Sequence, residues 1–162
     1  MLVTKERERV FEERLSEHLD GLYRTALRLE GTERRAGDLV AAAVRRAARA
    51  GRRTASEAAF RIELFRRLLE EARWTPPAGV IAPERSTSGV SDLSQVTDRG
   101  LLEAIDSLEL PFRLALWLHD VEGFNIREVS QLLGLSLENT KRCLYGARGA
   151  VRDTISSLRL RA

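Results

Sequence analysis

The sequence has little of what redox, metal and membrane sites require. Its single cysteine, Cys143, excludes an internal disulfide framework and a CxxC zinc site. No apolar run approaches the ~20 residues of a membrane-spanning helix, and the N-terminal segment MLVTKERERVFEER is too charged for a signal peptide. We therefore expect a cytoplasmic protein that does not insert into a membrane.

Motifs of catalysis are missing as well. The sequence contains no glycine-rich phosphate loop, no HExxH pair and no serine or cysteine nucleophile elbow. Its two histidines, His18 and His119, lie in patterns that favour structural roles, and Cys143 is interpreted as a small, semi-buried helix residue. We expect a protein that is not an enzyme and that uses no metal and no cofactor.

Proline is scarce, and its distribution suggests the domain organisation. Three of the four prolines, Pro76, Pro77 and Pro83, fall within residues 75–95, where helical periodicity is lost. We interpret this segment as a linker between a domain at 1–74 and a domain at 96–162. The 162 residues, of which 43% are hydrophobic and 31% charged, suit folded domains rather than disorder.

Helical periodicity is present on both sides of this linker, so the predicted fold class is all-α. In the N-terminal part, apolar residues recur at spacings of three and four near 4–29 and from 32 to about 50. A capping-box pattern at Thr54 and Glu57 predicts the start of a third helix, which Pro76 prevents from continuing.

The C-terminal part carries sharper start and stop signals. Its predicted helices open at Asp98, at Pro111, at the capping-box pair Asn125 and Glu128, and at Ser136. Gly134 supplies a turn between the last two helices. A short helix, a glycine-containing turn and a longer basic helix form the helix-turn-helix arrangement. Gly146 and Gly149 predict a bend or fraying in the final helix.

The last helix concentrates positive charge. Residues 139–162 hold six basic and one acidic side chain, whereas 96–138 hold three basic and eight acidic ones. Such a stripe is the footprint expected for binding a phosphate backbone, although a solvated helix face gives the same pattern. Apolar contacts between the two helices are expected at Val129, Leu133, Leu135 and Leu144.

This arrangement leaves polar residues of the last helix free to face outward. Amide and basic side chains near the start of a helix in the major groove reach base edges, and later arginines reach phosphates. The candidate DNA-binding residues are Glu138, Asn139, Lys141, Arg142, Tyr145 and Arg148. A plain helical hairpin would show the same apolar spacing.

The segment 101–148 resembles region 4 of the extracytoplasmic-function sigma factors. The matching features, in order, are Leu110-Pro111, Asp120-Val121-Glu122-Gly123, Glu128-Val129-Ser130, Leu133-Gly134, Asn139-Thr140-Lys141 and Ala147-Arg148. The resemblance implies that the last helix lies in the major groove of the −35 promoter element. Cys143 and Gly146 stand where the family has arginines.

The N-terminal part resembles region 2 of the same family less closely. RRAGDLVAAAVRRAARA aligns with the helix that binds the β′ clamp helices of RNA polymerase, which implies four polymerase-binding residues: Asp38, Leu39, Arg45 and Arg46. Ala41 replaces the usual glutamine of the family, and Val44 and Ala48 replace its aromatic residues.

The following helix, AAFRIELFRRLLEEARW, aligns with the family segment that melts and reads the −10 element. Its basic and partly aromatic residues suit stacking on unpaired bases. They are Arg61, Arg66, Arg67, Arg73 and Trp74. For Trp74, a role in closing the end of the helical core is an equally good interpretation.

The resemblance implies an extracytoplasmic-function sigma factor with two helical domains. Such a protein binds core RNA polymerase, at the β′ clamp helices and the β flap, and directs it to promoter DNA. Two alternatives remain open. A sigma-like interaction module would titrate an anti-sigma factor, and the substitutions in the N-terminal part motivate it. A stand-alone helix-turn-helix transcriptional regulator would never contact polymerase.

Overall fold

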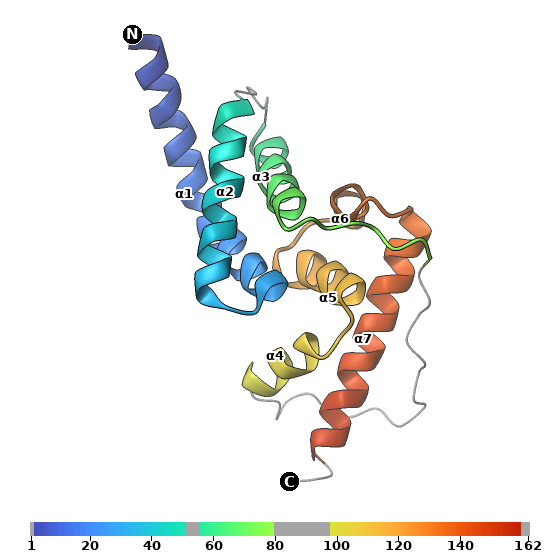
Figure 1. The fold of residues 1–162 in the computed structure, drawn as a ribbon. Helices are drawn as coiled ribbons and strands as arrows, with labels where there is room; N and C mark the ends of the chain where they lie inside the picture. The colour runs from blue at the N-terminus through green and yellow to red at the C-terminus, as the bar shows by residue number, and fades with distance from the viewer. Residues whose placement is uncertain (1, 51–55, 80–97, 160–162) are drawn as a thin grey trace. The chain divides into compact units, whose positions relative to one another are not determined.

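The computed structural model describes residues 2–50, 56–79 and 98–159 of the chain (Figure 1). These residues form seven α-helices and one π-helical segment, and none of them lies in a strand. The predicted all-α fold class is confirmed. The chain divides into two units, Met1–Trp74 and Thr75–Ala162. No helix in the described ranges combines the length and the apolar character needed to cross a bilayer.

Three helices form the N-terminal unit: α1 (Leu2–Glu30), α2 (Glu33–Ala50) and α3 (Glu57–Glu71). Each of the three packs against the other two. Their apolar stripes meet in a core that includes Leu22, Ala26, Leu39, Val40, Ala43, Phe60, Leu64, Phe65 and Leu68. Gly31, at φ 72°, ends α1 with a left-handed turn, which a residue without a Cβ adopts without strain.

The start of α3 differs from the prediction. Ser56 is the N-cap, and its side chain accepts a hydrogen bond from the Ala59 backbone amide at 3.2 Å. Thr54, the predicted cap, lies outside the described residues. The Glu57 side chain binds Arg14 at 2.8 Å and His18 at 2.6 Å, both on α1. Packing between helices therefore decided the role of Glu57.

The C-terminal unit is built around its last helix. Its elements are α4 (Asp98–Asp106), α5 (Leu110–Leu116), the π-helical segment η2 (Trp117–Val121), α6 (Ile126–Leu133) and α7 (Leu137–Arg159). The helices α4, α5 and α6 all pack against α7. Pro111 lies in the first turn of α5, as predicted. The change to π-helical hydrogen bonding at Trp117 was not predicted.

Helix α6 begins and ends as the local sequence predicts. The Asn125 side chain accepts hydrogen bonds from the Arg127 and Glu128 amides at 3.0 Å, and the Glu128 carboxylate accepts from the Asn125 amide at 2.8 Å. This reciprocal capping box opens α6. Gly134 closes it in the left-handed conformation, at φ 64° and ψ 27°.

Helix α7 is continuous from Leu137 to Arg159, so the helix does not fray at Gly146 or Gly149. Both glycines are buried. Tertiary packing along α7 outweighs the weak helix preference of glycine. Of the predicted linker 75–95, residues 75–79 have no helix, and residues from 80 onward lie outside the described ranges.

Candidate functional site

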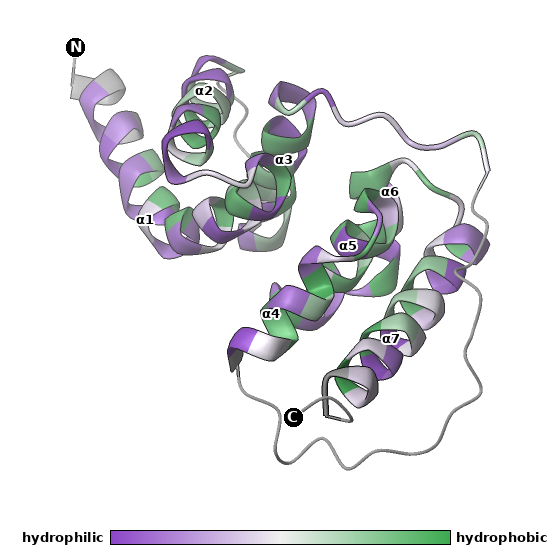
Figure 2. Cartoon of the chain, turned by 60° about the horizontal axis from the view of Figure 1, so that its bottom comes forward, coloured by the Kyte–Doolittle hydropathy of each residue, from purple (hydrophilic) through white to green (hydrophobic). Residues whose placement is uncertain are grey.

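One face of α7 is polar and exposed. Thr140, Cys143, Leu144 and Ala147 are buried on the opposite face. The sequence-predicted residues Glu138, Lys141, Arg142, Tyr145 and Arg148 are all exposed, whereas Asn139 is half-buried. In Figure 2, α7 carries hydrophilic and hydrophobic residues interleaved along its length, as expected for a helix with one buried face.

The turn before α7 holds this helix in place through several short hydrogen bonds. The Ser130 hydroxyl donates to the Leu135 carbonyl at 2.7 Å, and the Leu135 amide donates to the Ser130 carbonyl at 3.1 Å. Ser136 caps α7 by accepting from the Asn139 amide at 3.1 Å. The predicted apolar contacts Val129, Leu133, Leu135 and Leu144 are all buried.

Tyr145 is the most exposed large hydrophobic residue of this face, at 69% exposure. Lys141 and Arg142 lie one turn before it on α7. Arg142 forms an ion pair with Glu138 at 3.4 Å, and because both side chains are exposed this pair contributes little to stability. Arg152 was not among the predicted site residues, yet it extends the same exposed face. Its position seven residues after Tyr145 is the signal that could have identified it.

Arg148 has a partner within its own unit. Its Nε and Nη2 atoms donate to the Asp120 carboxylate at 2.9 and 2.5 Å, and His119 Nδ1 lies 2.6 Å from the same carboxylate. Both partners belong to η2. The side chain of Arg148, which was predicted to contact a phosphate, therefore already forms a charge-assisted interaction with Asp120 before any ligand is bound.

The Asp120 carboxylate should make the stability of the C-terminal unit depend on pH. Hydrogen bonding from Arg148 lowers the pKa of Asp120 below its ordinary value of 3.8; partial burial opposes this and His119 adds to it. A carboxylate with a lowered pKa stabilises the folded state above its unfolded-state pKa. That stabilisation disappears as pH falls through the folded-state pKa.

We therefore expect Asp120→Asn to flatten the loss of unfolding free energy as pH falls from about 5 to about 3. Urea denaturation followed by circular dichroism at several pH values measures this slope. Glu109→Gln is the control, because Glu109 is exposed and its side chain makes no cap hydrogen bond. Identical pH profiles for Asp120→Asn and the natural chain would contradict the expectation.

Cys143 is buried on the packed face of α7. Burial raises the pKa of its thiol to about 11, so the thiolate that reacts with oxidants and metals is scarce at neutral pH. The structural interpretation made from the sequence fits this environment.

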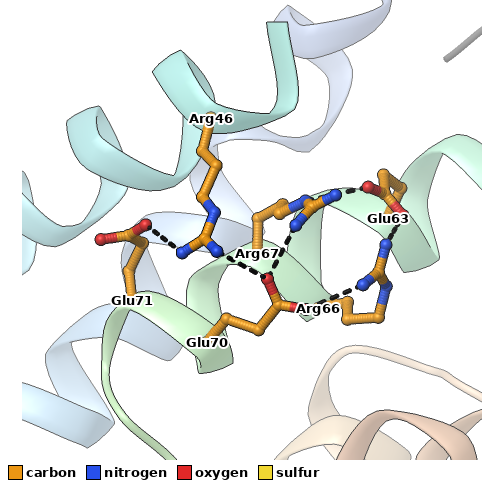
Figure 3. A network of polar contacts seen from close by, with 6 residues as sticks. All are labelled: Arg46, Glu63, Arg66, Arg67, Glu70 and Glu71. Atoms are coloured by element: carbon orange, nitrogen blue, oxygen red, sulfur yellow. Dashed lines mark hydrogen bonds and ion pairs between the residues drawn. The ribbon is translucent and has the colours of Figure 1, made fainter. Parts of the chain in front are cut away.

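The predicted nucleic-acid surface of α3 is occupied by ion pairs (Figure 3). Glu63 binds both Arg66 and Arg67, the latter at 2.9 Å. Glu70 binds the same two arginines, each at 2.8 Å. Arg46 of α2 connects to the same group of charges through ion pairs with Glu71 at 2.8 Å and with Glu70 at 3.9 Å. We call these six residues the α3 network.

The α3 network is partly withdrawn from solvent at its centre. The side chains of Arg67 and Glu63 are 14% and 13% exposed. Burial opposes the ionisation of Glu63, but the hydrogen bonds and positive charges of Arg66 and Arg67 outweigh it and lower the pKa of the Glu63 carboxyl. Three arginines and three glutamates give the network no net charge at neutral pH.

The remaining predicted residues of α3 have separate environments. The Arg61 guanidinium lies 5.6 Å from the centre of the Phe65 ring. Arg73 is exposed and adopts φ 55°, which is uncommon for a residue with a Cβ, and it turns the chain at the end of the helix. The Trp74 amide donates to the Leu69 carbonyl at 2.9 Å, and its side chain is half-buried.

The four predicted polymerase-binding residues of α2 divide between the surface and the core. Asp38 and Arg45 are exposed. Arg46 is held by the α3 network. Leu39 is only 8% exposed and belongs to the core, which corrects its expected role as a contact with a partner. Apolar residues recur on α2 at spacings of three and four, and this helical period places Leu39 on the face that packs against α1 and α3.

One group in the described residues has metal-ligand chemistry. Donor atoms of Glu17, His18 and Glu57 lie within 4.8 Å of one another. However, both carboxylate oxygens of Glu57 already accept contacts from Arg14 and His18. Arg14 also lies 4.2 Å above the centre of the Phe60 ring. These contacts tie α1 to α3, which accounts for the group as a structural element.

Comparison with known proteins places the fold. No protein-family model matches the sequence, and no curated protein matches it. Among solved structures, the sigma factor RpoE in complex with the anti-sigma factor NepR from Bartonella quintana is similar, with a TM-score of 0.61 and 19% identity. The alignment covers 90% of this chain and 96% of the chain it matches.

A second similar structure is the anti-anti-sigma factor PhyR in complex with NepR, also from Bartonella quintana. It matches with a TM-score of 0.55 and 20% identity, over 85% of this chain and 48% of the other. This chain thus spans about half the length of that protein. The fold of this chain is therefore all-helical and similar to the folds of these two structures.

Proposed function

We propose that this protein is a sigma-like interaction module that binds an anti-sigma protein. The observation that carries the proposal is the α3 network. A surface that holds unpaired bases needs available cations and aromatic rings. On α3, the two central arginines instead bind Glu63 and Glu70 on their own helix.

The charge balance favours a protein partner over single-stranded DNA. Nucleic-acid binding gains most of its free energy from cations that neutralise phosphates. The α3 network offers no net positive charge, so its affinity for a melted strand would be low. A polar surface of mixed charge suits a protein partner, where complementary charges give specificity. The function is binding alone, without catalysis, metal or cofactor.

Similarity of fold supports the class of partner. Each of the two similar structures contains the anti-sigma factor NepR, bound in one to a sigma factor and in the other to an anti-anti-sigma factor. A module of this fold that captures an anti-sigma protein would release the sigma factor that the anti-sigma protein inhibits.

A second candidate function is promoter recognition as a sigma factor. The exposed face of α7, with Lys141, Arg142 and Tyr145 on a firmly capped helix, favours this candidate. Asp38 and Arg45 on α2 would contribute to docking on the β′ clamp helices of core RNA polymerase. This function needs both promoter DNA and polymerase as partners.

Reconstituted transcription tests the proposal against the second candidate. Core RNA polymerase, a cognate sigma factor and its anti-sigma factor, all from the genome that encodes this chain, are combined with and without the full chain. We expect the chain to bind the anti-sigma factor in a calorimetric titration. It should also restore transcription by the inhibited sigma factor.

Two results would contradict the interaction-module proposal. One is the absence of binding to every anti-sigma factor of that genome. The other is promoter-specific transcription from core polymerase and this chain alone, which would instead support the sigma-factor candidate. The control omits the anti-sigma factor, and the chain should then leave the transcript level unchanged.

A further inference from the structure

Two basic groups of the C-terminal unit share the carboxylate of Asp120. Its Oδ1 atom lies 2.5 Å from Arg148 Nη2 and 2.6 Å from His119 Nδ1, and its Oδ2 atom accepts a hydrogen bond from Arg148 Nε at 2.9 Å. Arg148 Nη2 also lies 3.4 Å from His119 Nδ1. The two donors therefore meet at one carboxylate oxygen. We call these three residues the Asp120 cluster.

The π-helical hydrogen bonding of η2 accompanies this arrangement. The Glu122 amide donates to the Trp117 carbonyl, five residues earlier, at 2.9 Å. In an α-helix, consecutive side chains point about 100° apart, whereas the consecutive residues His119 and Asp120 both approach the guanidinium of Arg148. Single π-helical turns are uncommon and occur frequently at functional sites.

The Asp120 cluster is accessible to a ligand. The side chains of His119, Asp120 and Arg148 are 31%, 33% and 41% exposed. Arg148 lies on the exposed face of α7, one turn after Tyr145 and two turns after Lys141. A phosphate that contacts this face can reach the guanidinium only in competition with Asp120. While His119 is neutral, one carboxylate and one guanidinium leave the cluster without net charge.

The charged groups near His119 come from the elements that pack against η2, which include α5 and α6. Among the described residues, the hydrogen bonds and ion pairs of the His119 ring are with the other two members of the cluster. Helix α5 carries Arg113, which donates to two backbone carbonyls. Helix α6 carries Arg127 and Glu128, and Glu128 caps the start of α6. Glu122, which follows η2, is buried.

Protonation of His119 changes the competition for Asp120. A histidine ordinarily gains its proton between about pH 8 and about pH 5. Asp120 stays ionised in this range, because hydrogen bonding from Arg148 lowers the pKa of the Asp120 carboxyl below its ordinary value of 3.8. Nδ1 of the neutral ring donates to Asp120, so the added proton goes to Nε2. The charged ring is the stronger donor to a carboxylate, and it repels the guanidinium beside it.

We propose that His119 and Arg148 compete for Asp120, and that protonation of His119 releases Arg148 to bind a phosphate of duplex DNA. In the acidic state the cluster carries a net charge of plus one, and the carboxylate stays with His119. The guanidinium can then donate two parallel hydrogen bonds to a phosphate. The inference goes beyond the proposed function, because it concerns α7 and a nucleic acid rather than an anti-sigma protein, so each can fail alone.

Duplex DNA binding at two pH values tests this proposal. The full chain is titrated into a labelled mixed-sequence duplex at about pH 7.5 and about pH 5.5, at several salt concentrations. One additional phosphate contact should steepen the slope of log K against log salt by about 0.9 at the lower pH, and affinity at low salt should rise about threefold to tenfold. The same slope at both pH values would overturn the inference.

Three variants locate the effect. His119→Gln should show the same slope at both pH values. Asp120→Asn should show the steeper slope at both, because Arg148 is available throughout. His18→Gln is the matched control, because His18 is the other histidine of the chain and also lies beside a carboxylate, that of Glu57, at 2.6 Å. This control should keep the pH dependence of the natural chain. A pH dependence that persists in His119→Gln would contradict the proposal.

A second measurement needs no DNA. The chain is prepared with isotopically labelled arginine, and the Nε–H signal of Arg148 is identified by its absence in Arg148→Gln. This signal should shift between the two pH values in the natural chain and in His18→Gln, and should stay in place in His119→Gln. A signal that stays in place in the natural chain would show that Arg148 keeps Asp120 when His119 is charged, which overturns the inference whatever the DNA titrations give.

Discussion

Replacing Glu63 and Glu70 together by glutamine is expected to convert the α3 network into a cationic surface. The substitutions remove the carboxylates that hold Arg66 and Arg67, and they change the charge of the network from zero to plus two. Two available cations should tighten binding to single-stranded DNA on the order of tenfold at low salt. The slope of log K against log salt should steepen by about 1.4.

The same double variant should lose stability. Hydrogen bonds to charged groups contribute about 1.5–3 kcal/mol each when partly buried, and removing a carboxylate leaves arginines without their counter-charge. We expect the free energy of unfolding to fall by about 2–3 kcal/mol in urea denaturation, with the central pair Glu63 and Arg67 responsible for most of it.

Fluorescence anisotropy with a labelled oligonucleotide measures the gain in affinity. The matched control is Glu8→Gln with Glu12→Gln, which adds the same charge at exposed positions of α1. If the control gains as much affinity as the network variant, overall charge is responsible and the network has no special role. If neither variant gains affinity, the α3 surface does not bind single strands even when its arginines are released.

If the protein acts as the sigma factor of the second candidate function, replacing Lys141 and Arg142 together by alanine is expected to abolish most duplex DNA binding by α7. Both side chains lie on the exposed face, next to Tyr145 and opposite the buried residues Leu144 and Ala147. Loss of two phosphate contacts should reduce the salt slope by about 1.8 and lower affinity on the order of tenfold or more at low salt.

A labelled mixed-sequence duplex, titrated at several salt concentrations, measures both quantities. Arg9→Ala with Arg99→Ala is the control, because both arginines are exposed and, among the residues that the structure describes, they pair with glutamates of their own helices. An unchanged salt slope in the Lys141 and Arg142 variant would show that α7 does not contact DNA. The exposed face of α7 would then be available for a protein partner.

Local structure could be read from the sequence where a few neighbouring residues decide it. The capping box of Asn125 and Glu128 and the left-handed Gly134 are examples, because each involves contacts within four residues. The start of α3 was misplaced because Thr54 and Ser56 are both good caps. In the structure Ser56 is the cap, and Glu57 binds Arg14 and His18 of α1, contacts that the local sequence does not reveal.

The availability of the candidate site residues was harder to predict. The spacing of Glu63, Arg67 and Glu70 along α3 signals ion pairs within one helix, and that part of the network is visible in the sequence. The link from Arg46 to Glu71 is not visible, because it joins two helices. The same is true of Arg148, whose partner Asp120 is 28 residues away in the chain.

The sequence by itself determined where the helices of this protein lie, how most of them begin and end, and that α7 carries an exposed basic face. These properties depend on preferences and contacts that span one or two helical turns. The tertiary structure decided which cations remain available, that Leu39 belongs to the core, and that His119 and Arg148 meet at Asp120. Burial and ion pairing between helices depend on how distant segments pack, and a periodic pattern does not specify which helix meets which.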